Sequence, residues 1–354
     1  MATLLYRLGK ASYRRWGRVI VAWVVALLAV LGAGLTIGGQ TEEAFDIPGS
    51  ESQEAFERLE AVFPSFAGAS AQVVLVAPEG ERLDSTANTA VIRELARTIE
   101  TQEGVENVTT PFDEFAGEAL SDNGRYAYIQ VGFEMSSPEV SDAMIDALFS
   151  TRSIAESAGL TIEYGGAMFQ DQVVGLTYHE LLGVIFAGLV LIVTFRSLRP
   201  AWMPLASAIV GVGIAVGGIL IAALGFTISS SAPLLAVMLG LAVGIDYSLF
   251  ILSRHRDQLA RGDDPAESAA TAVGTAGNAV VFAGITVIIA LLGLFLVGIP
   301  FLSVMGASAA GAVAIAIVAA ITLLPALMGI MGEKLRPQPG SGAAKLALAG
   351  SNKP

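Results

Sequence analysis

The amino-acid sequence predicts an α-helical membrane protein that carries an α+β domain outside the membrane. Of its 354 residues, 54% are hydrophobic, and the mean hydropathy of +0.66 is too apolar for a soluble protein of this length. The charge is divided as well. Residues 40–178 contain 25 acidic side chains and six arginines, whereas the rest of the chain contains seven acidic and 14 basic side chains. A basic membrane part beside an acidic soluble part is typical of a protein with an outward-facing domain.

Six apolar segments are long enough to cross the bilayer as helices, because about 20 residues span the ~30 Å hydrocarbon core. Glycine and proline interrupt several of these segments, which transmembrane helices tolerate. The six segments are residues 19–38, 178–196, 201–224, 232–253, 274–297 and 302–330.

Basic residues predict how the segments are oriented, since cytoplasmic loops are enriched in lysine and arginine. Five basic residues precede the first segment, and others follow the second, fourth and sixth segments. We therefore expect both termini in the cytoplasm and the uncharged loops "GFTISSS" and "VGIPFL" outside. The first segment has no convincing cleavage site, so we expect a retained span rather than a signal peptide.

This topology divides a multi-pass protein of the cytoplasmic (inner) membrane into four parts. Residues 1–39 are the cytoplasmic N-terminus and first transmembrane helix, and residues 40–177 are the extracytoplasmic domain. Residues 178–331 are transmembrane helices 2–6. Residues 332–354 are a Gly/Ala/Pro-rich tail that we expect to be disordered in the cytoplasm.

Hydrophobic periodicity and turn residues predict the elements of the external domain. After an amphipathic helix over 50–64, in which Ala55, Leu59 and Val62 share one face, the order is β-α-β-β-α-β. This order is the split ferredoxin-like motif, which forms a small antiparallel sheet with two helices on one face. The predicted elements are strand 71–78, helix 85–104, strand 105–110, strand 125–135, helix 136–159 with Pro138 in its first turn, and strand 160–166.

Composition excludes several classes of function. There is no cysteine, and neither His179 nor His255 belongs to a metal-binding or protease motif, so we interpret both as polar residues near span ends. No nucleophile–base pair or phosphate loop indicates an enzyme, and the acidic domain would repel nucleic acid. The 25 acids lack calcium-loop spacing. Five phenylalanines of the domain either line a hydrophobic cavity or belong to its core: Phe45, Phe56, Phe63, Phe66 and Phe112.

Asp246 is the most informative residue, because its carboxylate lies inside the apolar stretch "LAVGIDYSLFILSR". An acid at mid-membrane costs roughly 2.5–3.5 kcal/mol on insertion scales. Asp246 precedes Arg254 by eight residues, or roughly 12 Å of helix, and no basic residue within a span can neutralise it. An acid that is neutral when buried and charged when wetted suits a proton relay. The alternatives are a structural acid hydrogen-bonded between helices and a site for another ion.

The neighbours of Asp246 fit the proton-relay hypothesis. Tyr247 follows directly and can donate a hydrogen bond or gate access to the carboxylate. Gly240 and Gly244 form a small-xxx-small pair that allows another helix to approach closely. Polar residues of the fifth segment either face Asp246 or bond back to their own helix; they are Thr275, Asn278 and Thr286.

The stretch "GLAVGIDYSLFILSRHRDQLARG" resembles the fourth-span signature of the MMPL family, which belongs to the resistance-nodulation-division (RND) superfamily of membrane transporters. "GSESQEAFERLEAVFP" resembles the start of the external, or porter, domain of that family, and "GTAGNAVVFAGITVIIALLGL" resembles its fifth span. One departure is Ala283, where family members often have serine. Members normally have twelve spans in two six-span halves, and this chain resembles the N-terminal half.

The resemblance implies export of lipids or other hydrophobic molecules from the cytoplasmic membrane, driven by proton entry. Asp246 would carry the proton, Tyr247 would be its partner, and Thr286 is a candidate supporting residue. No cofactor other than the coupling proton is implied. The partner would be a second six-span half, either another copy in a homodimer or a different chain. The alternatives are a lipid-sensing or scaffold membrane module and a subunit that assists protein export, as in the related Sec accessory pair.

Overall fold

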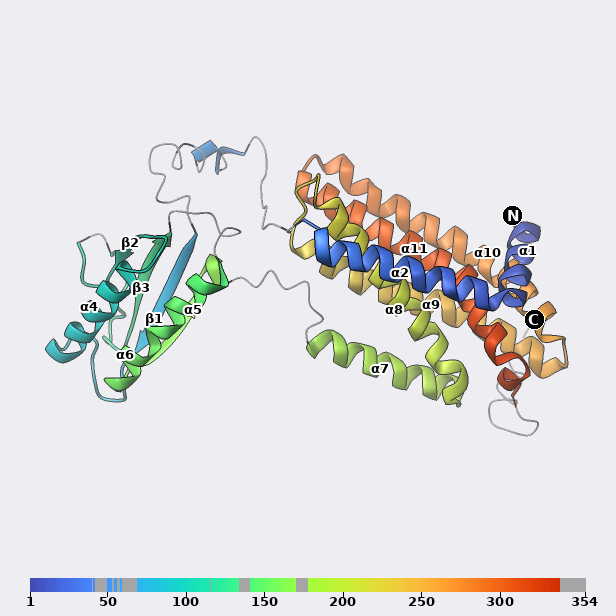
Figure 1. Ribbon diagram of the computed structural model, residues 1–354, viewed down its shortest axis with the longest axis horizontal. Helices are drawn as coiled ribbons and strands as arrows, with labels where there is room; N and C mark the ends of the chain where they lie inside the picture. The colour runs from blue at the N-terminus through green and yellow to red at the C-terminus, as the bar shows by residue number, and fades with distance from the viewer. Residues whose placement is uncertain are drawn as a thin grey trace. The chain divides into compact units, whose positions relative to one another are not determined.

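The computed structural model describes residues 1–39, 41, 50–52, 54–55, 58, 69–114, 116–133, 141–169 and 178–337. The chain divides into two compact units, one made of residues 1–46 and 173–354 and the other of residues 47–172 (Figure 1). Most of the helix predicted over 50–64 lies outside the described residues. So do four of the five phenylalanines considered for a cavity: Phe45, Phe56, Phe63 and Phe66.

The second unit contains a four-stranded antiparallel sheet with the strand order β2-β3-β1-β4. In β1 and β3, alternate side chains are buried, as the period of two in the sequence predicts. Val73 pairs with both Ile129 and Tyr164, so residues far apart in sequence meet on one sheet. The strands are β1 (Ser70–Val76), β2 (Val105–Thr109), β3 (Tyr126–Phe133) and β4 (Thr161–Gly165).

Helix α4 (Thr86–Glu100) covers the buried face of this sheet with Ile92, Leu95 and Ile99. It begins where the sequence predicts, because the Ser85 side chain accepts a hydrogen bond from the backbone N–H of Asn88. Phe112, the fifth phenylalanine, is half-buried and packs against the same core. The apolar faces of sheet and helices therefore form one core in this unit.

The prediction of one helix over 136–159 was wrong in one respect, because the described part of this segment consists of two helices. These are α5 (Asp142–Ser150), capped by the Ser141 side chain, and α6 (Arg152–Ser157). The hydroxyl of Thr151, between them, donates to the carbonyl of Leu148 and lies 3.1 Å from the Tyr164 hydroxyl. Such side-chain bonds to the backbone compete with a continuous helix, which accounts for the break. Pro138 lies outside the described residues.

The first unit is a bundle of helices. Among the residues that the structure describes, five helices are long and apolar enough to cross a membrane, whereas the sequence predicted six. The exception is the segment predicted at 178–196, whose apolar part, Leu181–Phe195, reaches only roughly 22 Å at 1.5 Å per residue. The elements are α1 (Ala2–Arg14), α2 (Trp16–Ile37), α7 (Tyr178–Phe195), α8 (Leu198–Ala222), α9 (Ser231–Arg261), α10 (Pro265–Leu292), η4 (Gly293–Val297), α11 (Pro300–Met331) and η5 (Gly332–Leu335).

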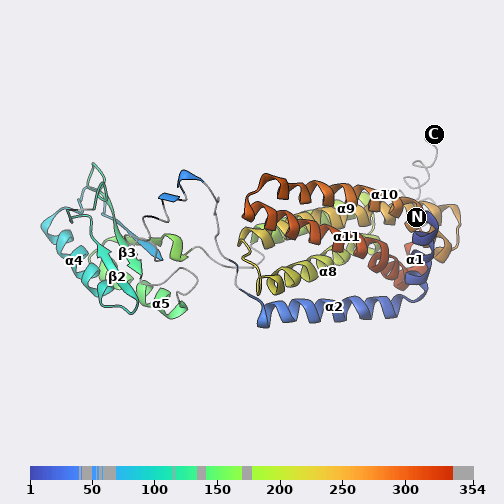
Figure 2. The ribbon, with the colours of Figure 1, turned by 90° about the horizontal axis from the view of Figure 1, so that it is seen from above.

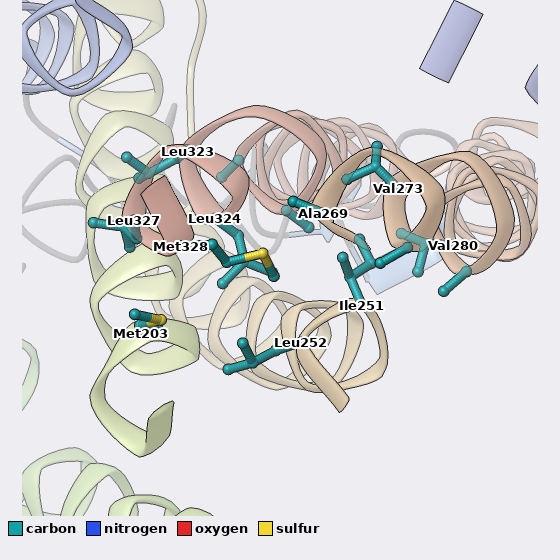
Figure 3. Close-up of a cluster of buried hydrophobic side chains, with 14 of the residues drawn as sticks. Met203, Ile251, Leu252, Ala269, Val273, Val280, Leu323, Leu324, Leu327 and Met328 are labelled. Carbon is teal, nitrogen blue, oxygen red and sulfur yellow. The ribbon is translucent and has the colours of Figure 1, made fainter. Parts of the chain in front are cut away.

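Small residues let these helices pack closely. Figure 2 shows α2 beside α8, and a Cβ added to Gly34 would lie 2.7 Å from the carbonyl oxygen of Gly217. Figure 3 shows the main apolar cluster, in which side chains of α8, α9, α10 and α11 meet. Its labelled members are Met203, Ile251, Leu252, Ala269, Val273, Val280, Leu323, Leu324, Leu327 and Met328.

The expectation of disorder from residue 332 onward was wrong for the first six residues of the tail. Residues Gly332–Leu335 form the short helix η5, and Leu335 is buried. Arg336 then pairs with Glu333 and donates to the backbone carbonyls of Leu259 and Asp263. These bonds attach the start of the tail to the end of α9, and residues 338–354 lie outside the described residues.

Candidate functional site

Helix α9 carries the predicted Asp-Tyr pair and continues beyond the span that the sequence predicted. It runs to Arg261 rather than to residue 253 and ends at Gly262, whose φ of 101° is a left-handed conformation that glycine adopts readily. Helices α8, α10 and α11 pack against one side of α9. The helix therefore has an inner side toward these three helices and an outer side that the described part of the chain leaves exposed.

Asp246 lies on the outer side of α9. Exposed residues recur there at every fourth position, in the order Leu234, Met238, Ala242, Asp246, Phe250 and Arg254. Within the described residues, the Asp246 carboxylate has no hydrogen-bond or ion-pair partner. All the other members between Leu234 and Phe250 are apolar, so the carboxylate projects from an otherwise apolar row at roughly 12 Å from Arg254.

Gly240 and Gly244 lie on the opposite, inner side and are buried. A Cβ added to Gly240 would lie 2.8 Å from Cγ2 of Val212, and one added to Gly244 would lie 3.0 Å from Cβ of Ala208. Both glycines also face α11, since the same added atoms would lie 3.7 Å from Ala312 and Ala316, respectively. Their lack of side chains is what allows α8 to approach α9, whereas the distances to α11 are those of ordinary van der Waals contact.

Tyr247 lies between the two sides and is half-buried. Its ring is directed to α10, because Cε2 would be 3.4 Å from a Cβ added to Gly284. Ile317 of α11 lies even closer to the same position, through its Cδ1. Gly284, which the sequence analysis did not single out, therefore leaves space where Tyr247 and Ile317 converge.

The three polar residues of α10 are not gathered around Asp246. The hydroxyl of Thr275 donates to the carbonyl of Thr271 at 2.7 Å, and that of Thr286 donates to Phe282 at 3.0 Å. Both threonines are exposed and bond to their own helix, which is one of the two alternatives that the sequence left open. Asn278 is half-buried, and its Oδ1 has no partner among the described residues.

His255 forms a buried polar pair that sequence reasoning missed. It was interpreted as a polar residue near a span end, but its side chain is fully buried. Its Nδ1 lies 2.8 Å from Oγ of Ser268 on α10, and the Ser268 hydroxyl donates to the His255 carbonyl at 2.9 Å. The Ser268 hydroxyl has one proton, which it donates to the His255 carbonyl, so Nδ1 of His255 must be protonated and donate to the Ser268 oxygen. In this tautomer Nε2 is an acceptor, and it has no partner among the described residues.

Arg256 is a second functional candidate, which the sequence placed among the basic residues between the fourth and fifth predicted spans. Its guanidinium is largely buried, donates from NH1 to the backbone carbonyl of Phe195 at 3.1 Å, and lies 5.2 Å from the centre of the Phe195 ring. Phe195 is the last residue of α7, and Arg196, with a φ of 48°, turns the chain into α8. Arg256 therefore caps α7 from α9.

A continuation of the helical register would have identified His255. Gly244, Ser248 and His255 follow one another at spacings of four and seven, so extending α9 past residue 253 places His255 on the inner side.

The described residues contain no cluster of three or more His, Asp or Glu side chains that could hold a metal.

A bundle of apolar helices with an α+β unit inserted after the first long helix is the architecture of a multi-span membrane protein with a domain outside the bilayer. The MMPL family profile matches residues 44–345. Because this match covers well over half of the chain, the chain belongs to the MMPL family.

Several relatives resemble nearly the whole chain. Membrane protein YdfJ of Bacillus subtilis is 37% identical over 339 residues, which are 96% of this chain and 46% of YdfJ. Two MmpL11 proteins are each 28% identical to this chain. That of Mycolicibacterium smegmatis is named a mycolic acid-containing lipids exporter, and that of Mycobacterium tuberculosis is named a heme uptake protein. These alignments cover 90% and 89% of this chain and 34% and 33% of the relatives. A crystal structure of SecDF is similar with a TM-score of 0.43 and 16% sequence identity. The match covers 90% of this chain and 38% of the SecDF chain.

All of these alignments cover a much larger share of this chain than of the relative. Each includes about nine-tenths or more of this chain, but less than half of the relative. The chain thus spans about half or less of the length of the curated relatives it matches, and it aligns with only a part of each.

Proposed function

We propose that this chain is one six-span half of a transporter that exports lipids or other hydrophobic molecules from the cytoplasmic membrane, driven by proton entry. Asp246 carries the proton and Tyr247 is its partner. The observation that supports this most directly is the place of Asp246, whose carboxylate has no partner among the described residues and lies in an exposed, otherwise apolar row at mid-helix. A charge in that position is costly against lipid, which favours a covering partner and a proton that binds and leaves.

The second half is the expected covering partner. Membrane transporters are often built from two repeats related by an axis along the membrane normal. In a homodimer, the outer sides of two α9 helices would face each other, and the two Asp246 carboxylates would titrate as a coupled pair. A different chain could supply the same surface. The length of the relatives, about twice that of this chain or more, supports either arrangement.

The remaining architecture is assigned by the same proposal. α7 is the sixth, short span, and both termini are cytoplasmic because basic residues flank the bundle at that end. The sheet order β2-β3-β1-β4 with antiparallel neighbours supports a ferredoxin-like porter domain outside the membrane. Each proton that crosses 100 mV releases about 2.3 kcal/mol, which is available to drive rearrangement between the two halves.

Hydrophobic substrates are supported by the relatives, one named for export of mycolic acid-containing lipids and another for heme uptake. Both ligands are large and largely apolar, so the shared feature is chemical class rather than a particular molecule. We assign export as the direction, in line with the relative of Mycolicibacterium smegmatis that is named an exporter.

The test is reconstitution of the full chain into liposomes, with a fluorescently labelled phospholipid and an imposed pH gradient. We expect gradient-dependent lipid movement with the wild type and none with Asp246→Asn, which cannot release a proton. Asp263→Asn is the matched control, because Asp263 is an exposed carboxylate in the turn after α9. Light scattering of the same samples in detergent gives the mass of the assembly.

Full transport by Asp246→Asn would contradict the proton-carrying role. Loss of transport in both variants would show that the effect is not specific to Asp246. A wild-type monomer that moves neither lipid nor protons would contradict the homodimer and require a second chain.

A further inference from the structure

The N-terminal helix α1 has a feature that transport does not explain. It lies across one end of the helical bundle (Figures 1 and 2). Its inner face is fixed there: Leu5, Gly9 and Ser12 are buried, and a Cβ added to Gly9 would lie 2.8 Å from Cβ of Val273 on α10. A helix held in this direction at the end of a bundle runs along the membrane surface rather than through the bilayer.

Lys10, the one lysine of α1, is paired with an acidic residue of α10. The Nζ of Lys10 lies 2.7 Å from the Glu267 carboxylate, which also accepts a hydrogen bond from Tyr6. The hydrogen bond to Glu267 raises the pKa of Lys10, so this cation is committed to the contact with α10.

The outer face presents arginines that have no such partner. Arg7 and Arg14 lie two helical turns apart and are both exposed. The pKa of Glu267 on α10 is lowered by the hydrogen bond from Lys10 and, to a lesser extent, by the charge of Arg14. Arg15 and Arg18 follow at the junction with α2. All four are exposed, and none has an ion-pair partner among the described residues. No acidic residue occurs in the first 41 positions. Leu4 and Trp16 are exposed beside them. One edge of Trp16 lies against α11, because its Cδ1 would be 3.3 Å from a Cβ added to Gly329, and aromatic residues of this kind favour the headgroup level of a membrane.

We propose that this outer face, made of Arg7, Arg14, Arg15 and Arg18 with Leu4 and Trp16, binds the phosphate headgroups of anionic lipids at the membrane surface. Guanidinium groups hold phosphate oxygens with two parallel hydrogen bonds, and the apolar side chains reach the acyl boundary. Because Gly9 and Lys10 fix the opposite face on α10, bound headgroups stabilise α1 across the bundle end.

Binding of phosphatidylglycerol to the purified full chain in detergent, measured by native mass spectrometry, tests this proposal without relying on transport. Phosphatidylcholine, which has no net charge, is the lipid control, and inorganic phosphate at equal concentration is the ion control. The test variant is Arg7→Gln/Arg14→Gln. The matched variant Arg254→Gln/Arg261→Gln removes the same charge from exposed arginines at the end of α9.

We expect the phosphatidylglycerol affinity to fall about tenfold or more in the α1 variant and less than about twofold in the α9 variant. Phosphatidylcholine binding should not change in either. An equal loss in both variants would overturn the proposal, because it would reflect total charge alone. Unchanged affinity in the α1 variant would overturn it directly. If inorganic phosphate displaced the lipid at equal concentration, the site would be one for the free ion and not for a lipid.

Discussion

The two sides of α9 have different surroundings although they belong to one helix. The inner side is closely packed, with two glycines against α8 and α11 and with His255 and Arg256 bonded to neighbouring helices. The outer side is exposed and carries an unpaired carboxylate in an apolar row. Since an unpaired carboxylate exposed to lipid is costly, and since the inner side already packs against three helices, the difference favours the outer side as the place for a covering partner.

The largest effect on stability is expected from filling the glycine contact on the inner side. In Gly244→Val, the new side chain would meet Cβ and Cα of Ala208 at 3.0 and 3.3 Å, so α8 must move. We expect a loss of about 3 kcal/mol, seen as a lower thermal unfolding midpoint in detergent. Ala242→Val makes a matched change on the outer side and should leave the midpoint unchanged. Equal midpoints for the two variants would refute the difference between the sides.

Removal of the Arg256 contact should have the next largest effect. Arg256→Gln loses a charged hydrogen bond to the Phe195 carbonyl and the contact with the Phe195 ring, at a cost of about 2 kcal/mol. Arg254→Gln, two residues earlier on the exposed side, removes the same charge without a partner. Thermal unfolding of the two variants compares them, and a smaller loss for Arg256→Gln than for Arg254→Gln would contradict the cap.

Ser268→Ala should cost about 1–2 kcal/mol, because it leaves Nδ1 of buried His255 without its partner. Ser253→Ala is the control, since the Ser253 hydroxyl only donates to Phe250 of its own helix. The same unfolding measurement decides between them. A midpoint for Ser268→Ala equal to that of Ser253→Ala would show that the buried pair does not contribute.

The smallest effect is expected for Thr286→Val on the exposed side of α10. Its hydroxyl donates only to Phe282 of the same helix, so the unfolding midpoint should stay within about 1–2 °C of the wild type. Transport in liposomes should stay within about twofold of the wild type. A loss of transport as complete as that in Asp246→Asn would mean that Thr286 serves the carboxylate in the assembled transporter.

The sequence predicted the elements whose signals are local. The alternation in residues 126–131 correctly predicted which side chains of β3 are buried, and Ser85 correctly predicted the start of α4. Five of six spans followed from apolar length alone. The break at Thr151 was missed because it rests on one side-chain bond, from the Thr151 hydroxyl to the Leu148 carbonyl, which hydrophobic periodicity does not reveal.

The candidate site was predictable in its residues but not in its surroundings. Apolar context alone singled out Asp246 and Tyr247. Whether Thr275 and Thr286 face the carboxylate depends on how α10 is rotated against α9, and that rotation is set by contacts such as Tyr247 with Gly284. His255 and Arg256 were missed because polar residues at the end of an apolar stretch usually mark the end of a span. Here α9 continues, and its register buries them.

The cap on α7 has a mechanical consequence. α7 is an 18-residue helix of roughly 27 Å whose C-terminal end, at Phe195, is held by Arg256. Arg196, with its left-handed φ of 48°, is the pivot between this helix and α8. A rotation of about 10° at the pivot would displace the far end of the helix by roughly 5 Å. The geometry of α7 is thus that of a lever: a small rotation at its C-terminal end, next to α9, would become a displacement of several ångströms at its N-terminal end.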